Sequence, residues 1–94
     1  MSIESFRHKG LRRLAEHDDE RGVQKEQVTK IRRILFALQE AVEVSEMARY
    51  PGWQLHPLKG ELRGFWSITV TGNWRIVSRF ANGRAFDVDL VDYH

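Results

Sequence analysis

The sequence predicts a small α+β domain in which an N-terminal strand and two helices pack on one face of a mainly antiparallel β-sheet. Three observations favour this class. The length of 94 residues suits a single domain, 1–94, with one hydrophobic core. Apolar residues recur at helical spacing in the first half of the chain and alternate with a period of two in the last third. Helices followed by a run of strands are typical of α+β folds.

The first half of the chain contains a short strand and two helices. Residues 2–6 indicate the strand, and residues 8–21 indicate a first helix, for which Gly22 would be a left-handed stop. A second helix runs from Lys25 to about Val42. Its apolar residues follow alternating steps of three and four, which is the stripe of an amphipathic helix: Val28, Ile31, Leu35, Leu38 and Val42.

Three segments of alternating hydrophobicity, 65–70, 74–80 and 85–91, predict an antiparallel meander. Because directly paired residues share a face, core residues must pair with core residues. This favours three-residue loops, 71–73 and 81–83, which pair Ile68 with Ile76 and Ile76 with Val88. The other face then has nothing in the sequence left to cover it, so it is either a ligand surface or an ordinary wet sheet face. Its residues are Phe65, Ser67, Thr69, Arg75, Arg79, Asp87 and Asp89.

Charge is distributed unevenly although the net charge is only +2. Residues 1–48 are neutral, residues 49–84 hold six basic side chains against Glu61 alone, and residues 85–94 hold three aspartates. The middle block also holds six of the ten aromatic residues. Basic side chains interleaved with aromatic ones suit a polyanion with stackable bases, hence nucleic acid, but composition alone supports a solvated basic face over an aromatic core equally well.

Several classes of protein are excluded. The chain has no cysteine, so it has no disulfide framework or thiolate metal site. It lacks an apolar run of membrane-spanning length and an N-terminal signal segment, which predicts a cytoplasmic protein. The four histidines have no metal-ligand spacing, so no metal and no cofactor are expected.

Two segments could carry chemistry, His56-Pro57-Leu58-Lys59-Gly60 and the terminal Asp92-Tyr93-His94. Together with Arg75 they supply the groups that metal-free phosphodiester cleavage needs. These are a base for the 2′-hydroxyl, cations for the anionic transition state and an acid for the leaving oxygen. Each residue considered singly is more often structural.

The sequence resembles the HigB-type toxins of bacterial toxin–antitoxin systems, within the RelE/ParE superfamily. The resemblance covers nearly the whole chain, and three blocks carry it: Ser5 to Leu11; His56 to Gly60 followed by Gly64 to Ile68; and Asn73 to Ile76 with the terminal Asp92 to His94. It implies a RelE-like fold and a ribosome-dependent endoribonuclease that cuts mRNA in the ribosomal A site. It also implies a helix-turn-helix, HigA-like antitoxin as partner, with operator DNA bound only through that antitoxin.

Carried over by motif position, the catalytic residues are His56, Lys59, Arg75, Asp92, Tyr93 and His94. Lys59 and Arg75 are assigned to the phosphate and the transition-state charge, and the two histidines to proton transfer. The expected substrate-binding residues are Arg63, Phe65 and Arg79. Two other readings stay open: a ParE-like binder that poisons DNA gyrase, and an inactive relative that only binds an antitoxin or represses.

Overall fold

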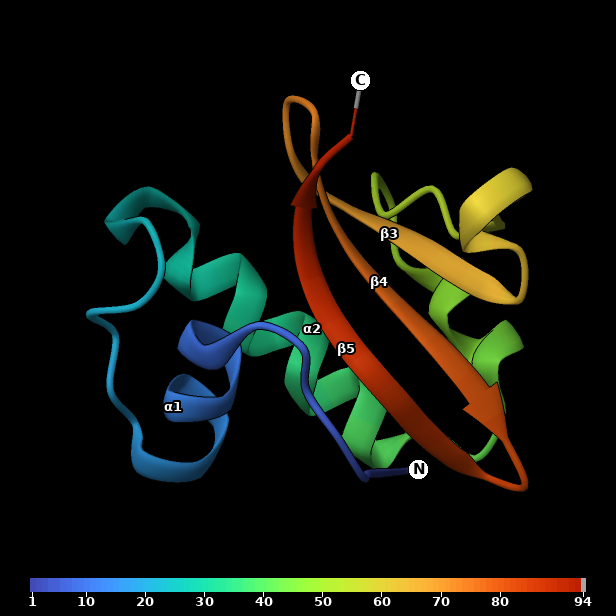
Figure 1. Cartoon of the computed structure of the whole chain (residues 1–94), viewed down its shortest axis with the longest axis horizontal. Coiled ribbons are helices and arrows are strands. Elements are labelled where there is room, and N and C mark those ends of the chain that lie inside the picture. Colours follow the sequence, from blue (N-terminus) through green and yellow to red (C-terminus); the bar gives the residue numbers. More distant parts are fainter. Residues whose placement is uncertain (94) are drawn as a thin grey trace.

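Two helices lie on one side of a five-stranded sheet in the computed structural model, which describes residues 1–93 (Figure 1). Helix α1 spans Lys9–His17 and helix α2 spans Val28–Glu40. The predicted α+β class is confirmed. No helix in the described part of the chain is long and apolar enough to cross a membrane.

Helix α1 is shorter than the predicted 8–21. It begins at His8, whose Nδ1 accepts a hydrogen bond from the Leu11 N–H at 3.1 Å, and it ends at Asp18, which adopts a left-handed φ of 56°. The predicted stop at Gly22 is therefore wrong, because aspartate tolerates that conformation and ends the helix earlier. Gly22 has another role: a Cβ on Gly10 would lie 2.2 Å from the Gly22 carbonyl oxygen, so both positions require glycine for close approach.

Helix α2 has the predicted amphipathic stripe but narrower limits than Lys25 to Val42. A 3₁₀ turn, η1 (Lys25–Gln27), precedes it, and Ala41 is already extended. Val42 lies outside the helix and is 77% exposed, so it does not extend the stripe. A second 3₁₀ segment, η2 (Val44–Arg49), leads toward the sheet.

The sheet has the order β1-β5-β4-β3-β2. Its central strands β3 (Phe65–Thr71), β4 (Trp74–Ala81) and β5 (Arg84–Asp92) form the predicted meander. The short strand β1 (Ser2–Ile3) pairs in parallel with β5, and β2 (His56–Pro57) pairs antiparallel with β3. A further short turn, η3 (Gly60–Leu62), lies between β2 and β3.

Both meander turns are shorter than predicted, and β-bulges restore the alternation of faces. Ala81 pairs with Arg84 around a two-residue turn, Asn82-Gly83, in which both residues have positive φ. A shift in register further along, beside Asp87 with its φ of 56°, absorbs one residue of β5. Ile76 therefore pairs with Leu90 and not with Val88.

The β3–β4 hairpin follows the same rule. Thr71 pairs with Trp74 around Gly72-Asn73, and a bulge between Thr69 and Thr71 keeps the predicted pairing of Ile68 with Ile76. The predicted shared face of Ile68 and Ile76 is confirmed. The predicted core position of Phe86 is wrong, because before the bulge Phe86 pairs with Arg79 and Ala85 lies in the main core.

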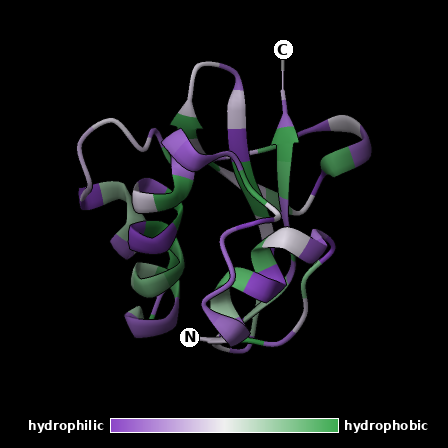
Figure 2. Cartoon of the chain, turned by 90° about the vertical axis from the view of Figure 1, so that its left-hand side faces the viewer, coloured by the Kyte–Doolittle hydropathy of each residue, from purple (hydrophilic) through white to green (hydrophobic). Residues whose placement is uncertain are grey.

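The main core lies between the helices and one face of the sheet. Leu11, Ile31, Ile34 and Leu38 from the helices pack against sheet residues that are at most 8% exposed: Ile68, Val70, Ile76, Ala85, Val88 and Leu90. Figure 2 shows hydrophobic and hydrophilic residues along the strands as well as along the helices. This packing leaves the opposite face of the sheet, here called the second face, for other contacts.

Candidate active site

The second face is partly covered, contrary to the prediction of a wholly open polar surface. A small cluster of Leu58, Phe65 and Val77, all at most 5% exposed, lies on it, with Leu62 and Val91 packed alongside. The segment between β2 and β3 supplies Leu58 and Leu62, and this segment follows His56 directly. The cluster anchors the His56–Gly60 block to the sheet.

His56 lies on the edge strand β2, directly opposite Ser67 of β3, and it is exposed. Its Nδ1 lies 2.9 Å from the main-chain oxygen of Gln54. Because a carbonyl oxygen can only accept, Nδ1 carries the proton of this hydrogen bond. The neutral imidazole then has its lone pair on Nε2, which leaves Nε2 able to accept a proton.

Lys59 follows Leu58, whose position is fixed in two ways. The Leu58 N–H donates to the Phe65 carbonyl at 2.8 Å, and the Leu58 side chain is buried in the cluster. Lys59 itself is exposed and begins turn η3. The structure therefore places an exposed ammonium group three residues from His56, next to a backbone that Leu58 holds against the sheet.

Arg75 lies on β4, opposite Thr69 on one side and Val91 on the other. The predicted three-residue loop 81–83 would pair Arg75 with Asp89; this pairing is wrong, because the shorter turn and the bulge near Asp87 together place Asp89 opposite Val77. The Arg75 Nη1 donates instead to the carbonyls of Gly72 at 2.7 Å and Trp74 at 3.1 Å. These backbone bonds hold the guanidinium at the β3–β4 turn.

His56 and Arg75 both lie on the second face of the sheet. His56 pairs with Ser67 and Arg75 pairs with Thr69, and these two residues of β3 are on the same face because they are two positions apart. Two strand spacings, about 10 Å, separate their strands, with β3 between them. A phosphodiester group above β3 can therefore be approached by both side chains. The sheet brings these two predicted residues to one surface although they are 19 positions apart in sequence.

The C-terminal segment reaches the same end of the sheet. The Tyr93 N–H donates to the Asn73 carbonyl at 2.8 Å, so the exposed Tyr93 lies beside the turn that holds Arg75. Asp92 pairs with Trp74, so strand alternation assigns it to the opposite face from Arg75. The predicted residue His94 lies outside the described residues.

The three predicted substrate-binding residues differ in their surroundings. Arg63 is exposed at the end of η3. Arg79 forms an ion pair with Asp87 at 2.9 Å and lies over the Phe86 ring. Phe65 is 5% exposed within the cluster, so it packs the second face and is not an open platform for a base.

Arg7 is a cation of the second face that the site prediction missed. Its guanidinium carbon lies 5.0 Å from the centroid of the Phe65 ring, while its N–H donates to the Val88 carbonyl at 2.9 Å. Arg7 follows β1, the edge strand that pairs in parallel with β5, and its side chain extends from that edge toward Phe65 of β3. The sequence around Arg7 does not predict this placement, because it depends on the parallel strand pairing.

A comparison with known protein families shows which family this chain belongs to. Residues 4–94 match the model described as the RelE-like toxin of the type II toxin–antitoxin system HigB. The chain belongs to the HigB-like toxin family. It is 46% identical over 92 residues to the Endoribonuclease HigB of Proteus vulgaris, a match covering 98% of this chain and 99% of that protein.

Solved structures are similar to this HigB-like toxin along its whole length. A mutant of YafQ from E. coli matches with a TM-score of 0.60 at 14% identity, covering 97% of this chain and 91% of that one. A YoeB/ParE toxin from Agrobacterium tumefaciens matches with a TM-score of 0.57 at 22% identity, covering 100% and 99%. These similarities confirm the predicted RelE-like fold.

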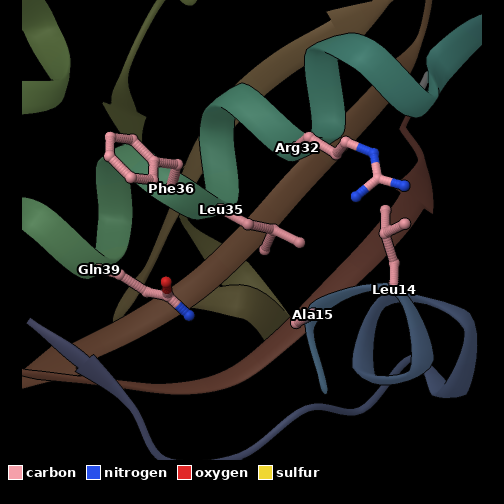
Figure 3. A pocket seen from close by; sticks show the side chains of 6 residues that line it. All are labelled: Leu14, Ala15, Arg32, Leu35, Phe36 and Gln39. Carbon is pink, nitrogen blue, oxygen red and sulfur yellow. The ribbon is translucent and has the colours of Figure 1, made fainter. Parts of the chain in front are cut away.

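A toxin of a type II system has an antitoxin as partner. The helical side of this HigB-like toxin has a hollow surface. A hollow of about 290 Å³ lies between α1 and α2, lined by Leu14, Ala15, Arg32, Leu35, Phe36 and Gln39 (Figure 3). Ion pairs with Glu20 and Asp18 raise the pKa of Arg32, which ties this cation to the α1–α2 loop. Phe36 is 64% exposed beside the hollow.

No metal cluster accompanies the site. Among residues 1–93, no three histidine, aspartate or glutamate side chains lie close enough to share an ion. The groups available at the second face are an imidazole, an ammonium, guanidinium groups and a phenol. Their chemistry is proton transfer and charge stabilisation on a phosphate.

Proposed function

We propose that this HigB-like toxin is a ribosome-dependent, metal-independent endoribonuclease that cleaves mRNA in the ribosomal A site and so inhibits translation. Family membership and the 46% identity to Endoribonuclease HigB support the endoribonuclease activity. The observation that carries the chemistry is the hydrogen bond that leaves His56 Nε2 able to accept a proton, on the same face of the sheet as Arg75.

In the proposed reaction, His56 Nε2 removes the proton of a ribose 2′-hydroxyl. The 2′-oxygen attacks the adjacent phosphorus, the bond to the 5′-oxygen breaks, and a 2′,3′-cyclic phosphate forms. Lys59 and Arg75 stabilise the charge that develops on the phosphoryl oxygens. The leaving 5′-oxygen takes a proton from His94, the second histidine assigned to proton transfer.

The proposed partners follow from the same assignment. A helix-turn-helix, HigA-like antitoxin would silence the toxin and carry it to operator DNA, whereas the toxin alone would bind the ribosome and mRNA in the cytoplasm. Arg63 and Arg79, with Arg7, would contact RNA phosphates along the second face. Phe65 has no part in base stacking in this proposal, because it is buried.

The test compares cleavage of mRNA on translating ribosomes by the wild type, His56→Ala and the matched control His17→Ala. His17 is an exposed histidine at the end of α1, on the helical side of the molecule. We expect discrete cuts by the wild type and His17→Ala, and a loss of about 10²-fold or more for His56→Ala. Intact messages together with trapped or cleaved DNA would support the ParE-like gyrase poison instead.

A further inference from the structure

The residue that holds His56 has an unusual backbone conformation. Gln54 adopts a φ of 49°, in the left-handed region that costs energy for residues other than glycine, asparagine and aspartate. It is exposed, so burial does not impose this conformation. Nearby, Gly52 takes the positive φ of the preceding turn as expected for glycine. A strained glutamine two residues before a catalytic candidate suggests a function.

Contacts hold both the residue before Gln54 and the Gln54 side chain. Trp53 is buried in the main core, stacks on Tyr50 with a centroid separation of 3.9 Å, and accepts a hydrogen bond from the Thr69 N–H at 2.8 Å. The Thr69 hydroxyl then donates to the Gln54 side-chain oxygen at 3.3 Å. Strand β3 therefore fixes both the backbone before Gln54 and the Gln54 side chain.

The held backbone presents its carbonyl oxygen to His56 Nδ1 at 2.9 Å. An exposed histidine with no such partner can place its proton on either ring nitrogen and can rotate. A fixed acceptor at Nδ1 selects the tautomer whose Nε2 lone pair is free, and it limits rotation of the ring. Glycine at position 54 would relieve the strain but would lose the bond to Thr69.

We propose that Gln54 is a positioning residue for the RNA-cleavage reaction: held in the left-handed conformation by Thr69, it uses its main-chain oxygen to keep His56 in the Nδ1–H tautomer. This inference rests on the proposed function, in which His56 Nε2 is the base. Gln54 itself contacts neither the base's proton nor the phosphate. Its effect is on the rate of the chemical step and not on binding of the ribosome.

The experiment measures the ¹⁵N chemical shifts of the His56 ring in the free protein, together with single-turnover cleavage on ribosomes. Gln54→Val resists positive φ because valine is β-branched, whereas Gln54→Gly accepts it and loses only the side-chain bond. Ser67→Ala is the matched control. Ser67 lies directly opposite His56, and its buried hydroxyl makes no hydrogen bond with any described residue.

We expect the Nδ1–H tautomer in the wild type, in Ser67→Ala and in Gln54→Gly. Gln54→Val should shift His56 toward the Nε2–H tautomer and slow the single-turnover rate by about 10-fold or more, with KM changed by less than about twofold. Gln54→Gly should lose less than about threefold. If Gln54→Val does not fold, Thr69→Val replaces it, because it removes the hydroxyl that holds Gln54 with little change in shape.

An Nε2–H tautomer in the wild type, or an unchanged tautomer in the folded Gln54→Val and Thr69→Val variants, would overturn the inference. The tautomer is read without RNA, so this result is independent of cleavage. Normal cleavage by His56→Ala would instead overturn the assignment of His56 as base, whatever the tautomer.

Discussion

The two faces of the sheet use the same strands for different purposes. On the helix-covered face, Ile68, Ile76 and Leu90 belong to one continuous core that includes both helices. On the second face Leu58, Phe65 and Val77 form a small separate cluster, and the Arg7 guanidinium lies over the Phe65 ring. Successive residues of β4 alternate between these environments, so Arg75, Ile76 and Val77 differ in role although they are adjacent.

This difference shows how a chain of 94 residues can hold both a core and a reactive surface. Hydrophobic stabilisation grows with buried apolar area, and the helical layer supplies most of it on one side. The second face needs only enough packing to fix His56 and Lys59. Its remaining polar groups are then free to meet a ligand.

The largest expected effect on stability separates Ile76 from Val77. Both are 1% exposed, but Ile76 lies in the main core and Val77 in the small cluster. Ile76→Ala should lower the free energy of unfolding by about 2–5 kcal/mol, because it leaves a cavity among rigid neighbours. Val77→Ala should cost about 1–2 kcal/mol. Chemical denaturation of the two variants measures this, and equal losses would contradict the contrast between the faces.

Arg75 gives the largest expected effect on activity. Arg75→Ala should reduce RNA cleavage by on the order of 10²-fold, because it removes a charged donor from the transition state. Its melting temperature should stay within about 4 °C of wild type, since its bonds go to exposed turn carbonyls. Arg84→Ala, which removes an exposed arginine paired with Glu4 at 3.4 Å, is the control and should cleave normally. A large loss of stability for Arg75→Ala would make Arg75 structural.

The Arg79–Asp87 pair tests how little the charges of the second face contribute to stability. Its distance is 2.9 Å, but the two side chains are 46% and 28% exposed. A double-mutant cycle with Arg79→Gln and Asp87→Asn should give a coupling energy of about 0.2–1 kcal/mol, which falls as salt is added. Asparagine is chosen because it tolerates the positive φ of position 87. A coupling above about 2 kcal/mol would show that this face depends on its ion pairs.

Much of this fold could be predicted from the sequence, because hydrophobic periodicity determines which residues face the core. The second helix and the three central strands follow directly from that pattern, and so does the shared face of Ile68 and Ile76. The two-residue turns and the bulges could not be predicted, because a turn shortened by one residue and a bulge of one residue together keep the same alternation of faces. In the β4–β5 hairpin these two changes shift the pairing by two residues, which moves Asp89 away from Arg75.

The candidate site remains a prediction, although the structure adds to it. Residue chemistry suggested His56, Lys59 and Arg75, and strand pairing places His56 and Arg75 on the second face. The sequence did not suggest Gln54 or Arg7, because their placement depends on a left-handed backbone and on a parallel strand pairing. Neither feature has a signature in residue type or spacing.

The smallest expected effect concerns Glu46, a charge that serves structure on the helical side. Hydrogen bonds from the backbone N–H groups of Glu43 at 2.8 Å and Val42 at 2.6 Å hold the pKa of Glu46 below its ordinary value of 4.5. A carboxyl whose pKa is lower in the folded state stabilises the protein above the unfolded value, and this stabilisation is lost as pH falls through the folded value. Glu46→Gln keeps an acceptor oxygen but removes the charge. Its melting temperature should therefore lie slightly below that of the wild type at pH 7, and the difference should vanish well below pH 4.5.

Glu61→Gln makes the same charge change at an exposed position, so the difference between its melting temperature and that of the wild type should be small throughout this pH range. Melting curves across this pH range decide the matter: a Glu46→Gln difference that persists in acid would show that the side chain acts by packing and not by its charge.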